Sequence, residues 1–159
     1  MRYDVGGITV GDEELCPIYG GAFNGWLVHA CKSKCHQVAV NYTGSLPKDH
    51  AEYLTARRGT HYYANVVDAP VPIFRREVFV GVLDFLDEAL GAGGRVGCHC
   101  NKGRSRAPAI VATYLAKRAK TIPSDSWDAA KAVMLERYPE FAPGLGIDTF
   151  LRAQWGTIS

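Results

Sequence analysis

The 159-residue sequence has no long uninterrupted apolar run and no strong excess of charge of either sign. No stretch approaches the roughly 18 apolar residues needed to cross a bilayer, and the first ten residues lack the apolar centre of a signal peptide. A formal net charge of +2 is too small to favour a nucleic-acid or membrane partner. We therefore expect a cytoplasmic protein with no membrane span and no nucleic-acid partner.

Cysteine is also scarce. The sequence has 5 cysteines, an odd number without the density of a disulfide scaffold, so we expect reduced thiols that are free to act as nucleophiles or metal ligands. Repeats and linkers rich in glycine, serine or proline are absent, which predicts a single domain over residues 1–159. With 47% hydrophobic and 21% charged residues, this domain has the composition of an ordinary globule with a buried core.

Short runs of β-branched and aromatic residues predict strands at residues 37–42 and 61–67, with a short helix at 48–58 between them. Apolar residues recur at helical spacing over 76–90, while Glu77, Asp84, Asp87 and Glu88 lie on the other side of that helix. The glycine-rich stretch 91–94 ends it, and residues 95–99 are predicted to form a short buried strand.

The next helix is predicted to begin near Ala107, because Pro108 is tolerated in a first turn, where its missing N–H costs nothing. Ser124 is the expected N-cap of a helix through residue 136, and Asp148 of a final helix that reaches residue 155. Strands that alternate with helices indicate an α/β domain with a central, mostly parallel sheet flanked by helices.

Between the predicted strand and helix lies a motif in which cysteine is followed six positions later by arginine. Its sequence is His99-Cys100-Asn101-Lys102-Gly103-Arg104-Ser105-Arg106. A chain of this composition is expected to contain about 0.001 such motifs by chance when the histidine and the glycine are required as well. The motif therefore calls for a chemical explanation.

A loop that enters a helix N-terminus presents backbone N–H groups and partial positive charge, which favour a phosphate dianion. The same field stabilises a thiolate at Cys100, making it a nucleophile. Arg106 can hold two phosphoryl oxygens with its planar guanidinium. Gly103 permits a tight turn without a side chain in the bowl, and His99 is interpreted as a neutral hydrogen-bonding brace. The other loop residues, Asn101, Lys102, Arg104 and Ser105, are predicted to line the phosphate site.

This His-Cys-x5-Arg motif between a strand and a helix resembles the signature of the protein tyrosine phosphatase superfamily, particularly its small dual-specificity members. The resemblance covers roughly residues 37–155, and residues 1–35 match nothing in it. It implies a phosphatase that forms a phosphocysteine at Cys100 without a cofactor and acts on phosphorylated proteins or other phosphate monoesters. It also implies a general-acid aspartate about thirty residues before the nucleophile, and Asp68 lies 32 positions before Cys100.

Asp68 would protonate the leaving group and later activate water, because an alkoxide or phenoxide leaves poorly without a proton. The simpler alternative is a turn aspartate before the proline-rich residues 69–72. Asp84 and Asp87 are weaker candidates because they lie on the solvated face of their predicted helix.

Two departures from the family pattern leave the substrate and the rate open. Ala107 stands where the family usually has serine or threonine, thought to help the thiolate leave, so a slow or inactive phosphate-binding pseudophosphatase is an alternative.

Lys102 and Arg104 make the loop more cationic, which resembles phosphoinositide-directed members; an RNA end is another possible substrate. Both residues are otherwise solvated loop cations. A rhodanese-like sulfur transferase also uses a cysteine loop, but it has no use for Asp68.

The remaining cysteines favour simpler interpretations. Cys98 is expected to be a small core residue that faces away from Cys100, two positions on. Cys31, Cys35 and His36 invite a metal site to which residues 98–100 add ligands, but their spacing departs from the usual two-residue pattern. From the sequence we therefore expect no bound metal. Arg75 and Arg76 are a solvated helix start or a contact for acidic substrates.

Overall fold

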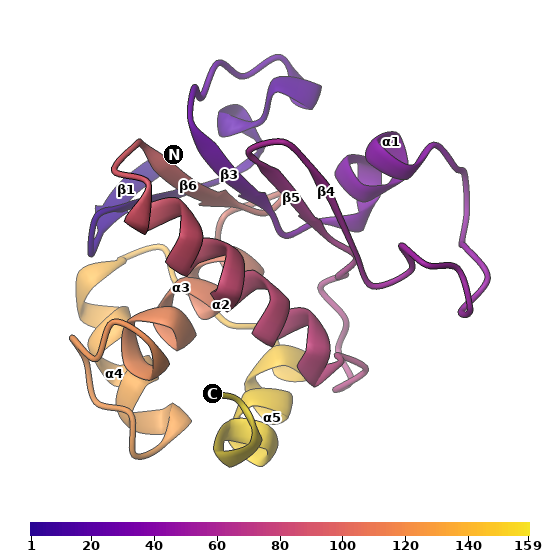
Figure 1. Cartoon of the computed structure of the whole chain (residues 1–159). Coiled ribbons are helices and arrows are strands. Elements are labelled where there is room, and N and C mark those ends of the chain that lie inside the picture. Colours follow the sequence, from indigo (N-terminus) through magenta and orange to yellow (C-terminus); the bar gives the residue numbers. More distant parts are fainter.

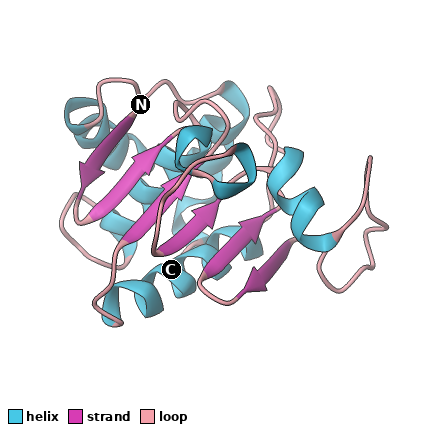
Figure 2. Cartoon of the chain, turned by 90° about the horizontal axis from the view of Figure 1, so that it is seen from above, coloured by secondary structure: helices cyan, strands magenta, loops and turns pink.

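The structure is a computed structural model that describes all residues from 1 to 159. Its centre is a six-stranded sheet in the order β1-β2-β6-β3-β5-β4, and the strands are seen side by side in Figure 2. The four inner strands run parallel, and each edge strand is antiparallel to its neighbour, which confirms the mostly parallel sheet. The strands are β1 (Arg2–Val5), β2 (Ile8–Gly11), β3 (Trp26–His29), β4 (Thr55–Arg58), β5 (His61–Ala64) and β6 (Val96–His99).

Helices cover both faces of the sheet unequally (Figure 1). On one face α2 (Arg76–Gly91) and α3 (Arg106–Lys117) pack against the strands, and α4 (Trp127–Arg137) and α5 (Leu145–Gln154) complete that side. The opposite face carries only short elements and loops. These are η1 (Glu13–Leu15), η2 (Pro17–Tyr19), η3 (Lys32–His36) and α1 (Gln37–Val40); a last turn, η4 (Trp155–Thr157), follows α5.

The alternation of side chains along the central strands divides the core. Val28 of β3 and Cys98 of β6 join the large cluster beneath the helices, while Leu27 belongs to a small cluster on the other face. His29 and His99 alternate with Val28 and Cys98 and therefore face away from the helices. The two histidines are register partners on adjacent parallel strands, which sets them side by side.

Several predicted elements are confirmed. Helix α2 spans Arg76–Gly91, β6 spans Val96–His99, and α3 begins at Arg106. The strand β5 ends at Ala64, before residue 67, because the Val66 carbonyl turns away to accept hydrogen bonds from the Lys32 N–H and the Arg106 guanidinium.

The strand predicted at residues 37–42 is wrong. Residues Gln37–Val40 form a helical turn, which Asn41 ends in the left-handed conformation with φ +64°. The two neighbours of β5 in the sheet are β3 and β4, so this segment has no place there. Its β-branched residues are not buried in a pleat, since Val38 is 55% exposed.

The helix predicted at 48–58 is also wrong. Turns precede β4, which pairs antiparallel with β5. Arg57 and Arg58, at the end of this edge strand, form ion pairs with Glu88 and Glu52. Local propensity did not reveal the pairing with β5 or the ion pair of Arg57 with Glu88, 31 positions away.

Two helix starts differ from the prediction by a few residues. Ser126, not Ser124, caps α4, and its side chain accepts a hydrogen bond from the Ala129 N–H at 3.1 Å. Helix α5 begins at Leu145, so Asp148 lies inside its first turn. There its carboxylate accepts hydrogen bonds from Trp127, Lys131 and Arg152.

Candidate active site

The loop between β6 and α3 presents unpaired backbone donors. None of the backbone N–H groups of residues 101–105 donates a hydrogen bond within the protein, and α3 has no side-chain cap. The loop lies at the carboxyl end of a central parallel strand, where α/β sheets commonly bind ligands. These donors and the N-terminus of α3 together form a site suited to an anion.

Gly103 holds the loop close to the neighbouring strand. Its φ is +68°, and a Cβ atom there would lie 2.8 Å from the carbonyl carbon of Gly11 and 2.9 Å from the nitrogen of Asp12. The Gly103 carbonyl accepts a 2.6 Å hydrogen bond from the buried Tyr138 hydroxyl, and the Cys100 N–H donates to the Gly11 carbonyl at 3.3 Å. The conformation of the loop is therefore fixed by β2 and by Tyr138.

Arg106 is buried, with 8% of its surface exposed, and lacks one hydrogen-bond acceptor. Its Nη1 donates to the Val66 carbonyl at 3.1 Å and its Nη2 to Asn101 Oδ1 at 3.0 Å. Its Nε, also buried, has no partner. Because an unsatisfied buried donor is costly, this N–H favours an acceptor from a ligand, such as a phosphoryl oxygen.

Asn101 positions that guanidinium, a role that the sequence did not reveal. While its Oδ1 accepts from Arg106, its Nδ2 donates to the Ser33 carbonyl at 2.8 Å and to the Tyr19 hydroxyl at 3.0 Å. These contacts join the loop to the segment around η2 and η3 on the face opposite the helices. The partners lie 68 and 82 positions away, so no local pattern could have indicated them.

Asp68 lies at the same cavity as Cys100 and Arg106, which has a volume of about 500 Å³. Its Oδ1 accepts a 3.0 Å hydrogen bond from the Ser105 hydroxyl, whose oxygen accepts from the Gly144 N–H at 2.9 Å. The structure thus brings together the three residues to which the sequence assigned the chemistry.

The other two aspartates considered for the acid role are engaged elsewhere. Asp84 and Asp87 both form ion pairs with Arg118, and Asp87 also accepts a hydrogen bond from the Tyr114 hydroxyl. Neither residue lines the cavity that contains Cys100.

Lys102 and Arg104 line the mouth of this cavity. Both side chains are exposed and form no ion pair within the protein. They also line a neighbouring cavity of about 600 Å³, whose other walls include the carboxylates of Asp12, Glu13, Glu14 and Glu140. The two cations therefore lie between the Cys100 cavity and an acidic recess.

His99 lies against the backbone of the loop that carries Cys100. It is fully buried, its Nδ1 lies 3.2 Å from the Cys100 carbonyl oxygen, and its Nε2 lies 2.9 Å from His29 Nδ1. Burial alone lowers the pKa of His99. A hydrogen bond to Cys16 and the negative charge of nearby cysteine sulfurs outweigh burial, so its pKa is raised.

Solved structures of other proteins share the fold of this chain. The human tyrosine phosphatase-like serine/threonine/tyrosine-interacting protein is 18% identical with a TM-score of 0.66, covering 99% of this chain and 96% of that one. Human DUSP28 is 15% identical with a TM-score of 0.63, covering 98% and 93%. A mouse putative dual specificity phosphatase, in complex with zinc tungstate, is 18% identical with a TM-score of 0.63, covering 98% and 86%. The chain has the dual-specificity phosphatase fold.

The likeness to dual-specificity phosphatases lies in the fold, because the identities are low. No family model matches the sequence, and no curated protein matches it either. In this phosphatase fold the loop that carries Cys100 and Arg106 follows the central strand β6 and leads into α3. None of the helices combines the length and the apolarity of a bilayer-spanning segment.

Proposed function

We propose that the chain hydrolyses phosphate monoesters through a phosphocysteine formed on Cys100. The observation that carries this proposal is the cavity where Cys100, the unpaired Nε–H of Arg106 and the carboxylate of Asp68 meet beside the free backbone N–H groups of residues 101–105. Thiol, donors and carboxylate are the groups that a two-step phosphoryl transfer requires.

In the first step the Cys100 thiolate attacks phosphorus, the ester P–O bond breaks, and Asp68 gives its proton to the departing oxygen. Negative charge on the phosphoryl oxygens is stabilised by the loop N–H groups and by Arg106. In the second step water attacks phosphorus and gives a proton to the Asp68 carboxylate. The S–P bond then breaks, which releases phosphate and restores the thiolate.

A slow phosphate-binding module is the second candidate, and Ala107 favours it. This residue is fully buried at the start of α3 and offers no hydroxyl to the departing sulfur. The nearby Ser105 hydroxyl donates to Asp68, so it does not replace the missing group. Such a module would keep the binding bowl and lose sustained turnover.

Turnover of p-nitrophenyl phosphate separates the two candidates. We expect steady hydrolysis by the wild-type chain, none by Cys100→Ser, and a large loss for Arg106→Lys, because a point charge cannot replace the bidentate guanidinium. Cys98→Ala is the matched control, since it removes a buried thiol two residues from Cys100 and leaves the loop intact. Product that never exceeds one equivalent, with phosphate still bound, would favour the binding module instead.

The residues around the Cys100 cavity select the substrate. A panel of phosphotyrosine, phosphoserine and phosphothreonine peptides, phosphoinositides and RNA ends, compared by kcat/KM, identifies the class. The exposed cations of Lys102 and Arg104 favour a substrate with further negative charge near the scissile phosphate.

A further inference from the structure

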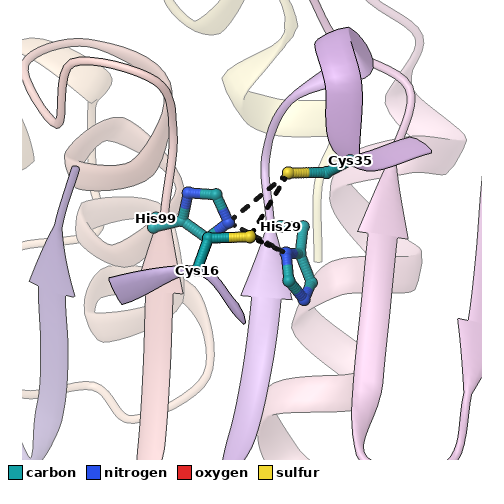
Figure 3. A group of neighbouring side chains, drawn as sticks. All are labelled: Cys16, His29, Cys35 and His99. Atoms are coloured by element: carbon teal, nitrogen blue, oxygen red, sulfur yellow. Dashed lines mark hydrogen bonds between the residues drawn. The ribbon is translucent and has the colours of Figure 1, made fainter. Parts of the chain in front are cut away.

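On the sheet face opposite the helices, two thiols and two imidazoles that the proposed hydrolysis does not use converge on one point. Figure 3 shows the four side chains pointing toward one another. Their ligand atoms all lie within 4.8 Å of one another, and all four residues are buried. They come from four segments: the junction of η1 and η2, the end of β3, η3, and the end of β6. We call this group the Cys2His2 cluster, and its members are Cys16, His29, Cys35 and His99.

Three of the six separations between the ligand atoms lie close to those around a tetrahedral zinc ion, and all six are within 4.8 Å. Bonds of about 2.3 Å to sulfur and about 2.0 Å to nitrogen give tetrahedral edges of about 3.8 Å between sulfurs, 3.5 Å between sulfur and nitrogen, and 3.3 Å between nitrogens. The two Sγ atoms lie 3.6 Å apart, Cys16 Sγ is 3.4 Å from His29 Nδ1, and Cys35 Sγ is 3.8 Å from His99 Nε2. The two ring nitrogens are closer, at 2.9 Å.

The outer nitrogen of each imidazole has the partner that a metal-binding histidine needs. His99 Nδ1 lies 3.2 Å from the Cys100 carbonyl oxygen, which can only accept, so Nδ1 carries a proton. His99 Nε2, on the side of the cluster, can then bind a metal with its lone pair once any proton there is lost. His29 Nε2 faces His61 Nδ1 at 2.8 Å, which leaves the His29 Nδ1 lone pair free when Nε2 donates. Such contacts orient histidine ligands and fix their tautomers.

We propose that this cluster binds one Zn²⁺ as a structural ion, held by Cys16, His29, Cys35 and His99. Two sulfur and two nitrogen ligands in a tetrahedron suit zinc better than metals that prefer oxygen or planar coordination. Binding releases two thiol protons, so the buried centre of one Zn²⁺ and two thiolates is electrically neutral. With four protein ligands the ion has no open position, and it takes no part in the phosphoryl transfer.

The sequence did not predict this metal site, because its ligands are far apart in the chain. The spacing of Cys31, Cys35 and His36 suggested a local metal motif with further ligands from residues 98–100, yet the cluster takes only Cys35 from the first group and His99 from the second. Parallel pairing of β3 with β6 places His29 beside His99, 70 positions apart in the chain. Only the folded sheet assembles these ligands.

The ion would stabilise the wall behind the phosphate bowl. Tyr19 and Ser33, which hold the Asn101 side chain, lie within three residues of Cys16 and Cys35. His99 directly precedes Cys100. The metal site is nevertheless independent of the proposed hydrolysis, because it requires neither Cys100 nor turnover.

The test is metal content of the full chain, produced with zinc in the medium and passed through gel filtration with a weak chelator. We expect close to one equivalent of zinc per chain by elemental analysis. X-ray absorption of the wild-type protein should show two sulfur and two nitrogen neighbours at about 2.3 and 2.0 Å. This measurement needs no variant, so it holds even if a substituted chain fails to fold.

Variants locate the ion. Cys35→Ser should lose the zinc, whereas Cys98→Ala, which removes another buried thiol, and Cys100→Ser should keep it. Zinc lost from Cys100→Ser but kept by Cys35→Ser would place the ion on the nucleophile and overturn the proposal. So would a wild-type chain without zinc after refolding with Zn²⁺, whether its thiols are free or Cys16 and Cys35 form a disulfide. None of these results depends on whether the chain hydrolyses a phosphate ester.

Discussion

At the scale of single residues, the proposed hydrolysis depends on which aspartate gives a proton to the leaving group. The Asp68 carboxylate lines the Cys100 cavity, while Asp84 is held by Arg118 outside it. We expect Asp68→Asn to lower kcat/KM, which reports the first step, by roughly 10²- to 10⁴-fold on alkyl phosphates, whose leaving groups need a proton. The loss should be smaller with a leaving group that departs as a stable anion. Steady-state kinetics on both substrates measure the difference, and a larger loss in Asp84→Asn would show that the acid is misassigned.

Ala107 concerns the second step. When sulfur leaves phosphorus, negative charge returns to Cys100, and a hydroxyl at position 107 would donate a hydrogen bond to it. The missing interaction is worth about 1.5 to 3 kcal/mol, so breakdown of the phosphocysteine should limit the rate. Rapid mixing with p-nitrophenyl phosphate should then show a burst of nitrophenol close to one equivalent.

The matching variant is Ala107→Ser, which should shrink the burst and raise kcat by roughly 10-fold or more, because each 1.36 kcal/mol is a factor of ten. Absence of a burst in the wild type, together with an unchanged rate in the variant, would mean that another donor already serves the thiolate.

At the scale of elements, the loop between β6 and α3 carries two cations without protein partners, and an acidic recess adjoins them. Replacing Lys102 and Arg104 together with alanine should raise KM for a polyphosphorylated substrate more than for p-nitrophenyl phosphate. High salt should narrow the gap between these substrates, because the interaction is screened. Equal changes in KM for the two substrates would mean that Lys102 and Arg104 are solvated cations that do not select the substrate. A Glu140→Gln variant is the control, because it removes a charge from the acidic recess and leaves Lys102 and Arg104 in place.

Element prediction succeeded where hydrophobic periodicity and tertiary packing agree. Helix α2 buries the face that its spacing indicates, and β6 is buried along its whole length. It failed at residues 37–42 and 48–58, where propensity was the only guide. Strand β4 forms because it can pair with the free edge of β5. Residues 37–40 form a helical turn on the face of the sheet that lies away from α2 and α3.

At the scale of the whole molecule, a bound zinc would join four segments that are far apart in sequence. If the ion binds only the folded chain at 1,000 times its Kd, it adds about 4 kcal/mol to the free energy of unfolding. For a domain of this size that corresponds to roughly 8 to 16 °C in Tm. A strong chelator should therefore lower the wild-type Tm by that amount in a calorimetric scan.

The control for this stability change is a chain that cannot bind the ion. Cys35→Ser should unfold at the same temperature with and without chelator, whereas Cys98→Ala should keep the wild-type sensitivity. A wild-type Tm that does not respond to chelator, in protein shown to contain zinc before treatment, would contradict a structural role for the ion.

The sequence by itself determined the loop from Cys100 to Arg106 between a strand and a helix, and the alternation of strands and helices. These follow from local rules: a strand, a tight turn and a helix N-terminus are contiguous in the chain, and helical periodicity is visible within one segment. Only the tertiary structure decided that Asn101 orients Arg106 and that Ser105 is committed to Asp68. It also decided that two histidines and two cysteines from four segments come together in one buried cluster. The physical reason is that parallel strand register brings distant residues into contact, and no local pattern encodes that register.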